Sequence, residues 1–204
     1  MFIMRFFNFL FKSRGMLELV RTFLLKSNFR DWGHNSKLGK LMYLNGEKFI
    51  SVGDNTGFGD YLSLVAWEQR YYYDSLGNKQ LKLFEPQISI GSNCTFGAYN
   101  NITAINKIQI GDGFLSGKWV TITDNSHGET SKESLSVNPL KRPMVSKGPV
   151  IIGCNVWVGD KVTILPGVCI GDGVVVAANS VVTKSFPNNC IIGGNPAQII
   201  KIYN

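Results

Sequence analysis

A six-residue repeat limits what this chain can fold into more than any other feature of its sequence. In the C-terminal half, an aliphatic β-branched residue recurs at every sixth position, at Ile152, Val158, Ile164, Ile170, Val176 and Val182. A second apolar or small residue follows each of them four positions later, and glycine, asparagine or aspartate fills many of the remaining positions. This period is neither the 3.6 of an α-helix nor the 2 of a simple strand. A fixed short repeat instead predicts a solenoid of stacked units.

One hexapeptide suits one flat side of a coil. A short strand segment points alternate side chains inward, and the tight turn that follows favours glycine or asparagine, which accept unusual backbone dihedrals. Three sides close a triangular turn of about 18 residues, and stacking such turns buries the recurring aliphatic residues in a continuous core. We therefore expect an all-β protein with the fold of a parallel β-helix.

The same phase is present earlier in the chain, where two long interruptions break it. Its shorter sets are Val52, Phe58 and Leu64; Ile90, Phe96 and Ile102; and Ile110, Ser116 and Ile122. The interruptions, from about residue 65 to 87 and from about 125 to 149, are expected to be insertions at the corners of the coil, where solenoids commonly build a binding face. In the first, Trp67 and Tyr71–Tyr73 either stack on a sugar or, as we prefer, pack one side of a hairpin. The second is rich in proline and is expected to be an extended, ordered arm.

Residues 1–48 are expected to form an N-terminal segment that precedes the β-helix of residues 49–204. Met16, Leu19, Val20, Phe23 and Leu24 follow helical spacing and predict an amphipathic helix that ends by about residue 29. Its phenylalanines and basic residues suit either of two uses. The helix packs against the end of the β-helix as a cap, which is the preferred interpretation, or it lies on a membrane surface.

Short motifs around the repeat carry a resemblance to a known family. They are NSHG at residues 125–128, NVWVG at 155–159, VVTK at 181–184 and GGNPA at 193–197. Together with the hexapeptide run, over about residues 49–201, they resemble the hexapeptide-repeat acetyltransferases. The similarity is greatest to the sugar and polysaccharide O-acetyltransferases related to maltose and galactoside acetyltransferases. The resemblance implies a left-handed coil, a homotrimer, acetyl-CoA as co-substrate and no metal.

The resemblance also implies a catalytic role for His127, the histidine of NSHG. Acetyl transfer from a thioester to an alcohol needs a base that removes the hydroxyl proton, and the pKa of imidazole suits that task near neutral pH. The other histidine, His34, lies outside the repeats and in no motif. His127 is therefore the expected general base.

By position in the family pattern, donor-binding residues follow His127 along the chain. Trp157, the backbone around Asp160, and Ala178 are expected near the pantetheine and thioester, and Thr183 and Lys184 near the adenine and phosphates. Gln198 stands where related enzymes often have arginine, which leaves Lys201 as the nearest cation for a phosphate. Asn100 and Asn101 are candidate acceptor-binding residues, although both also suit turns.

Composition limits the partners and the location. The net charge of +7 favours an anionic partner such as coenzyme A, an acidic glycan or a membrane surface, and no nucleic-acid-binding motif accompanies it. No secretory signal or apolar run of bilayer-spanning length is present, so we expect a cytoplasmic protein that is peripheral to the membrane if its N-terminal segment binds there. The four cysteines, which form no CxxC pair, are expected to be small buried hydrophobic residues.

Three alternatives remain open. In the first, the acceptor is an amino group of a nucleotide sugar, and in the second it is a xenobiotic of the chloramphenicol type. Both stay open because acceptor choice depends on the variable insertions. A non-catalytic β-helix that binds a glycan or a partner protein is the third alternative. A zinc-dependent carbonic anhydrase of the same architecture is excluded, because it needs three histidines and the chain has two.

Overall fold

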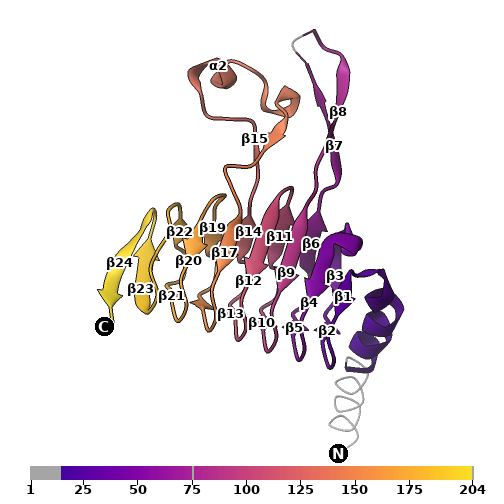
Figure 1. Ribbon diagram of the computed structural model, residues 1–204, viewed down its shortest axis with the longest axis vertical. Helices are drawn as coiled ribbons and strands as arrows, with labels where there is room; N and C mark the ends of the chain where they lie inside the picture. The colour runs from indigo at the N-terminus through magenta and orange to yellow at the C-terminus, as the bar shows by residue number, and fades with distance from the viewer. Residues whose placement is uncertain (1–14, 75, 204) are drawn as a thin grey trace, which may run out of the picture.

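Three sheets form the faces of a triangular coil in the computed structural model, which describes residues 15–74 and 76–203 (Figure 1). Face A contains β1 (Asp31–Trp32), β4 (Ile50–Val52), β9 (Gln87–Ile90), β12 (Lys107–Ile110), β17 (Val150–Ile152) and β20 (Cys169–Ile170). Face B contains β2 (Lys37–Leu38), β5 (Gly57–Phe58), β10 (Thr95–Phe96), β13 (Leu115–Ser116), β18 (Trp157–Val158), β21 (Val175–Val176), β23 (Cys190–Gly194) and β24 (Ala197–Ile202). Face C contains β3 (Leu41–Asn45), β6 (Leu62–Ala66), β11 (Asn101–Ala104), β14 (Thr121–Thr123), β19 (Thr163–Ile164) and β22 (Val181–Val182). The chain visits the faces in the order A, B, C, and the predicted left-handed parallel β-helix is confirmed.

The hexapeptide positions form the core of this coil. Equivalent residues of successive turns lie in register, as Ile102 does between Leu64 and Ile122 on face C. None of the six repeat positions from Ile152 to Val182 is more than 1% exposed. Residues that alternate with them point outward, which explains why Cys169 is exposed beside buried Ile170. The prediction of four buried cysteines is thus right for Cys94 and Cys190 and wrong for Cys169, while Cys154 is partly exposed.

The turns between faces A and B are held by repeated aspartates. The carboxylates of Asp54, Asp112 and Asp172 accept hydrogen bonds from backbone N–H groups of the preceding coil, at 2.6–2.7 Å. Close stacking explains the glycine that precedes each aspartate: a Cβ on Gly111 would lie 2.6 Å from the carbonyl carbon of Gly153. The GD pairs of the sequence therefore set the spacing between coils.

The β-helix begins about 18 residues earlier than expected from the repeat. Strands β1, β2 and β3 form a complete first coil and pair in parallel with β4, β5 and β6. This coil lies within residues 1–48, which were expected to form only a cap. Its inward positions Trp32, Leu38 and Leu44 are also spaced by six, and all three pack in or against the core.

The N-terminal helix, residues 15–25, covers the open end of the first coil, followed by η1 (Lys26–Asn28). Arg21 Nη1 donates to the carbonyl oxygen of Leu38 at 3.1 Å, and Thr22 Oγ1 accepts from Leu38 N at 2.9 Å. Leu25 packs against the core. The predicted helix is confirmed, and its contacts with the first coil are consistent with a cap. In the described part of the chain, no helix combines the length and the apolar character needed to cross a membrane.

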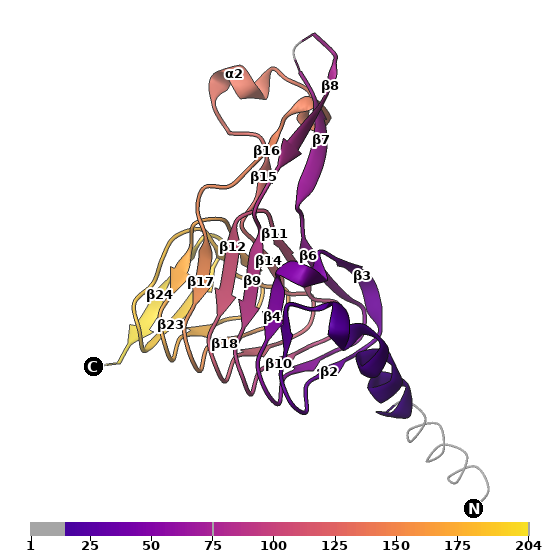
Figure 2. The ribbon, with the colours of Figure 1, turned by 45° about the vertical axis from the view of Figure 1, so that its right-hand side comes forward.

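Both insertions leave face C at its corner with face A and project from the same edge of the coil (Figures 1 and 2). The first is a hairpin of β7 (Gln69–Tyr73) and β8 (Lys79–Leu83). The short helix η2 (Glu47–Phe49) lies earlier in the chain, directly before β4 of the second coil. The second is an arm, residues 124–149, that contains β15 (Ser126–His127), α2 (Lys132–Leu135), η3 (Pro139–Lys141) and β16 (Met144–Val145). Lys82 Nζ of the hairpin donates to the carbonyl oxygen of Met144 in the arm at 3.0 Å. The two insertions therefore support one another.

Candidate functional site

His127 lies on β15 near the base of the arm, where it is exposed and pairs with Met144 of β16. Gly128 follows with a φ of +77°, a left-handed conformation that favours glycine. A Cβ on Gly128 would lie 2.7 Å from Cδ of Arg142. Arg142 in turn donates from Nε to the carbonyl oxygen of Val137 at 2.8 Å, so it lies between Gly128 and the loop that follows α2. The glycine of NSHG thus lets the arm fold back immediately after the histidine.

The base of the arm is fixed to the neighbouring coil. Asp124 is fully buried, and its carboxylate accepts the backbone N–H groups of Ile105 at 2.9 Å and Asn106 at 2.8 Å. Asn125 Nδ2 donates to the carbonyl oxygen of Thr103 at 3.0 Å. The Asp124 carboxylate therefore accepts from two backbone N–H groups and from the Asn125 amide, and it makes no hydrogen bond to the imidazole of His127. Among the described residues, that imidazole has no hydrogen-bond or ion-pair partner, which leaves both ring nitrogens available to another molecule.

Three of the predicted donor-binding residues lie together on face B and its following corner. Trp157 is 53% exposed on β18, between Leu115 and Val175 of the adjacent strands. Asp160 and Ala178 occupy the next corner in successive coils, where Asn179 N donates to the carbonyl oxygen of Asp160 at 2.9 Å. The Asp160 carboxylate has a structural role, because it accepts from Lys118 N at 2.7 Å. An exposed indole and two exposed corner residues, Asp160 and Ala178, therefore lie on this side of the coil.

The other predicted donor residues lie near the C-terminal end. Thr183 and Lys184 follow β22 and are exposed, and Lys201 lies on β24. Lys184 Nζ donates to Gln198 Oε1 at 2.7 Å, so the glutamine that replaces the usual arginine binds a neighbouring lysine. Lys201 Nζ lies 4.4 Å from the ring centroid of Tyr203. The ammonium groups of Lys184 and Lys201 thus lie on the surface near the C-terminal end of the coil.

His127 and the face B residues do not meet within one chain. The arm leaves the coil at the corner of faces C and A, and face B is the side of the triangle opposite that corner. Figures 1 and 2 show the arm on one side of the coil and the face B strands on the other. A site that uses both sets of residues requires a second copy of the chain.

The two candidate acceptor residues have different environments. Asn100 is only 2% exposed, and its amide donates to Ser116 Oγ at 2.6 Å and accepts from Val120 N at 2.8 Å. The expectation that Asn100 faces an acceptor is therefore wrong, because its amide joins two coils inside the core. Asn101, the next residue, points outward from face C and is partly exposed.

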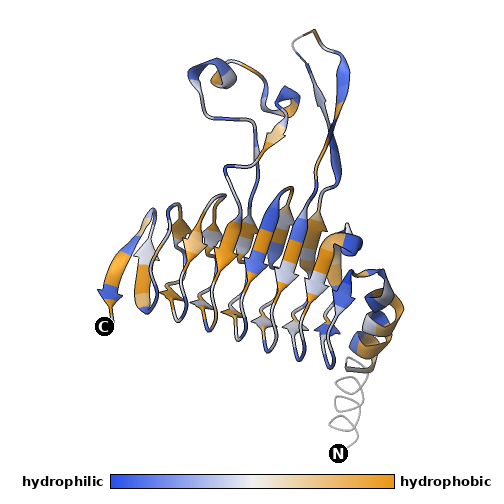
Figure 3. Cartoon of the chain, in the orientation of Figure 1, coloured by the Kyte–Doolittle hydropathy of each residue, from blue (hydrophilic) through white to orange (hydrophobic). Residues whose placement is uncertain are grey.

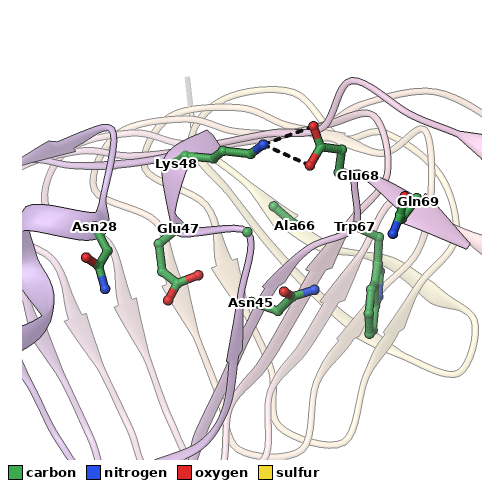
Figure 4. A pocket seen from close by; sticks show the side chains of 9 residues that line it. Asn28, Asn45, Glu47, Lys48, Ala66, Trp67, Glu68 and Gln69 are labelled. Atoms are coloured by element: carbon green, nitrogen blue, oxygen red, sulfur yellow. Dashed lines mark hydrogen bonds and ion pairs between the residues drawn. The ribbon is translucent and has the colours of Figure 1, made fainter.

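The hairpin supports the packing interpretation of its first aromatic residue. Trp67 lies with its ring centroid 5.9 Å from that of Tyr43, and the Arg70 guanidinium lies 4.2 Å from the indole centroid. A cavity of about 550 Å³ opens beside it at the foot of the hairpin (Figure 4). It is lined by Asn28, Asn45, Gly46, Glu47, Lys48, Ala66, Trp67, Glu68 and Gln69, with an ion pair between Lys48 and Glu68 at 2.9 Å. None of the predicted site residues lines this cavity.

An aromatic ladder on the corner between faces B and C escaped the sequence analysis. Tyr61, Tyr99 and Trp119 stack with ring centroids 4.6 Å and 4.0 Å apart, and each has a positive φ. The same corner continues in the next coils through Lys161 and Asn179, so the ladder leads directly to Asp160 and Ala178. The 20-residue spacing of Tyr99 and Trp119, equal to that of Asp112 and Ser92, was the available signal.

Comparisons with known proteins agree with these features. Residues 149–184 match the family model for the bacterial transferase hexapeptide, six repeats. The chain is 35% identical over 195 residues to WbbJ of Escherichia coli K12, described as a lipopolysaccharide biosynthesis O-acetyl transferase, with 93% of this chain and 89% of WbbJ covered. It is 33% identical over 178 residues to the galactoside O-acetyltransferase of the same organism, with 84% and 72% covered.

Solved structures share the fold. The N-acyltransferase AntD of Bacillus cereus, in complex with dTDP and 3-hydroxybutyryl-CoA, has a TM-score of 0.68 at 21% identity, with 90% of this chain and 88% of AntD covered. The hexapeptide-repeat acetyltransferase VCA0836 of Vibrio cholerae, complexed with acetyl-CoA, has a TM-score of 0.53 at 23% identity, with 91% and 78% covered. At these identities the likeness concerns the fold alone.

Proposed function

Because the chain belongs to the hexapeptide-repeat acetyltransferases, we propose that it transfers an acetyl group from acetyl-CoA to a hydroxyl group of a sugar or polysaccharide precursor, with His127 as general base. Two relatives that share a third of its residues over most of their length are described as O-acetyltransferases. The observation that carries the proposal is the position of His127, exposed on β15 with an unpartnered ring among the described residues and held on an arm that is fixed at its base.

The chemistry follows from an imidazole beside an alcohol and a thioester. One ring nitrogen of His127 takes the hydroxyl proton while the alcohol oxygen forms a bond to the carbonyl carbon. The carbon–sulfur bond then breaks, and the imidazolium returns the proton to the departing thiolate. The products are an acetate ester and free coenzyme A, and no covalent enzyme intermediate is needed.

Face B supplies the surface for the donor. The exposed indole of Trp157 offers an apolar contact for the pantetheine, and the small side chain of Ala178 leaves the backbone of its corner accessible. Lys184 and Lys201, farther along the coil, are cations suited to the phosphates. Asn101 remains our candidate for acceptor contact on face C.

A homotrimer completes this site. His127 and Trp157 lie on opposite sides of one coil, so each active site needs the arm of one subunit and face B of its neighbour. A head-to-tail contact of this kind closes into a ring when the rotation between subunits is a third of a turn.

An amino group is the second candidate acceptor, and one observation favours it. AntD, which has the same fold, is an N-acyltransferase. AntD is only 21% identical to this chain, whereas the two O-acetyltransferases are 35% and 33% identical. We therefore propose a hydroxyl group as the first candidate acceptor.

Release of free thiol from acetyl-CoA, measured against a panel of sugars, amino sugar nucleotides and polysaccharide repeat units, tests the proposal. With the best acceptor, His127→Ala should lower kcat by about 100-fold or more, because general base catalysis contributes that much. His34→Ala is the matched control, since the chain has two histidines and His34 lies in the first coil away from the arm. Full activity of a folded His127→Ala protein would refute His127 as the base, whereas absence of thiol release by the parent with every acceptor would favour a non-catalytic β-helix.

A further inference from the structure

The N-terminal helix presents its apolar side to solvent. Seen along the helix, one side carries Met16, Leu17, Leu19, Val20, Phe23 and Leu24, which are 50–71% exposed. These residues recur at three- and four-residue intervals and form one continuous apolar stripe, as the orange patches on the helix in Figure 3 indicate. A helix of a globular protein normally turns such a stripe toward the core.

The opposite side of the helix makes the contacts with the β-helix. Arg21 and Thr22 bond to the backbone of Leu38, Thr22 Oγ1 donates to the carbonyl oxygen of Glu18, and Leu25 packs on the core. The cap is therefore built mainly from polar side chains. Leu19 and Phe23 border the hollow between the helix and the first coil, yet both are more than half exposed, so the stripe calls for a further partner.

The positive charge of the N-terminal segment indicates an anionic partner for the stripe. Residues 1–30 contain six basic residues and a single acidic one, Glu18. Lys26 and Lys37 line a hollow of about 480 Å³ between the helix and the first coil, next to Phe23. Two copies of so basic a segment repel each other, whereas an anionic surface attracts it. An apolar helical stripe with basic neighbours is the pattern of helices that lie in the headgroup region of a bilayer.

We infer that the N-terminal helix docks the protein on an anionic lipid bilayer, with the stripe from Met16 to Leu24 in the interface and Lys26 and Lys37 at the headgroups. The helix lies at one end of the coil, while the arm and the hairpin project sideways from it (Figures 1 and 2). Docking at this end leaves the arm with His127 clear of the membrane. The inference does not depend on the proposed acetyl transfer.

Co-sedimentation of the full-length protein with vesicles tests the inference. The protein should bind vesicles of an equimolar mixture of phosphatidylcholine and phosphatidylglycerol, and bind less at high salt or to phosphatidylcholine alone. The double variant Leu19→Gln with Phe23→Gln should lose about tenfold or more in affinity, because two large apolar side chains no longer enter the interface. The double variant Leu83→Gln with Leu140→Gln removes equally exposed apolar residues from the hairpin and arm and should bind as the parent does.

Three results would overturn the inference. The first is failure of the parent protein to bind the anionic vesicles. The second is equal binding by the Leu19→Gln, Phe23→Gln variant. The third is a smaller oligomer of that variant in sedimentation equilibrium without lipid, which would make the stripe a contact between copies of the chain. Should that variant fail to fold, Lys26→Glu with Lys37→Glu takes its place, and unchanged vesicle binding by this pair would equally refute the docking.

Discussion

At the scale of single residues, Asn100 and its neighbour Asn101 offer a test that separates stability from acceptor binding. Asn100→Ala leaves Val120 N without its acceptor in the core, while Ser116 Oγ loses the bond from Asn100 but still accepts from Gly97 N. The orphaned group costs about 1–3 kcal/mol and the lost bond about 0.5–1.5 kcal/mol, so the free energy of unfolding should fall by about 1.5–4.5 kcal/mol. Denaturant unfolding measures the loss. Asn101→Ala on the outward side of the same strand should change stability by no more than about 0.5 kcal/mol. An unaltered unfolding free energy with a raised KM for Asn100→Ala would contradict the structural role.

The cysteines allow a second test at this scale. Burial raises the pKa of the Cys94 and Cys190 thiols, so both should stay protonated and unreactive at neutral pH. Cys169 is exposed on face A and should react first with iodoacetamide, followed by Cys154. Mass spectrometry of native and denatured protein identifies the labelled sites. Labelling of Cys94 in the folded protein, before Cys169 has reacted, would show that the coil opens locally.

Individual residues also show which features the sequence predicts well and which it does not. A strict period of six places Ile152 and its equivalents in the core, because strand alternation fixes which side each residue faces. The period also puts Asn100 at an inward position, four residues after Phe96, but asparagine suits an exposed turn as well as a buried position, and the residue type outweighed the period in the prediction. His127 was identifiable because a motif surrounds it, whereas its distance from face B depends on where the arm leaves the coil.

At the scale of elements, the contact between hairpin and arm should influence catalysis. Lys82→Met keeps the apolar stem but removes the hydrogen bond to the carbonyl oxygen of Met144, whose neighbour across the ribbon is His127. One lost bond of this kind is worth about 0.5–1.5 kcal/mol, so kcat/KM should fall about 2- to 10-fold. Steady-state kinetics with the best acceptor measures the change. Lys79→Met, which affects only the contact with Tyr71 in the same hairpin, is the control and should retain the parent value. Equal kcat/KM for the two variants would indicate that the hairpin does not position the arm.

Elements differ in how far their sequence determines them. Both insertions were predictable from the breaks in the repeat, because a long segment without the six-residue period does not supply the inward residues of a coil. The first coil was missed because Trp32, Leu38 and Leu44 are less uniform than the later β-branched residues, although their spacing is the same. Helical spacing predicted the N-terminal helix, but which side faces the β-helix was settled by hydrogen bonds from Arg21 and Thr22 that no periodicity reveals.

At the scale of the whole molecule, the stacking of coils separates the two halves of the proposed site. Periodicity predicts the stack, and the order of faces then follows from the chain. Whether a residue at one corner meets a residue on the opposite face depends on a second subunit, which no single sequence displays. The separation of His127 and Trp157 is therefore the feature from which the assembly can be tested.

Mixed trimers provide that test. His127→Ala removes the base from one side of a subunit, and Ala178→Trp fills the exposed corner of face B on the other. Each variant alone should be inactive. When the two are co-expressed in equal amounts and assemble at random, about a quarter of the subunit contacts combine an intact arm with an intact face B, so about a quarter of parental activity should return. Mixing the two proteins after separate purification, without exchange of subunits, is the control and should restore none. Absence of activity in co-expressed trimers shown by mass spectrometry to contain both variants would mean that His127 and face B act within a single chain or not in the same reaction.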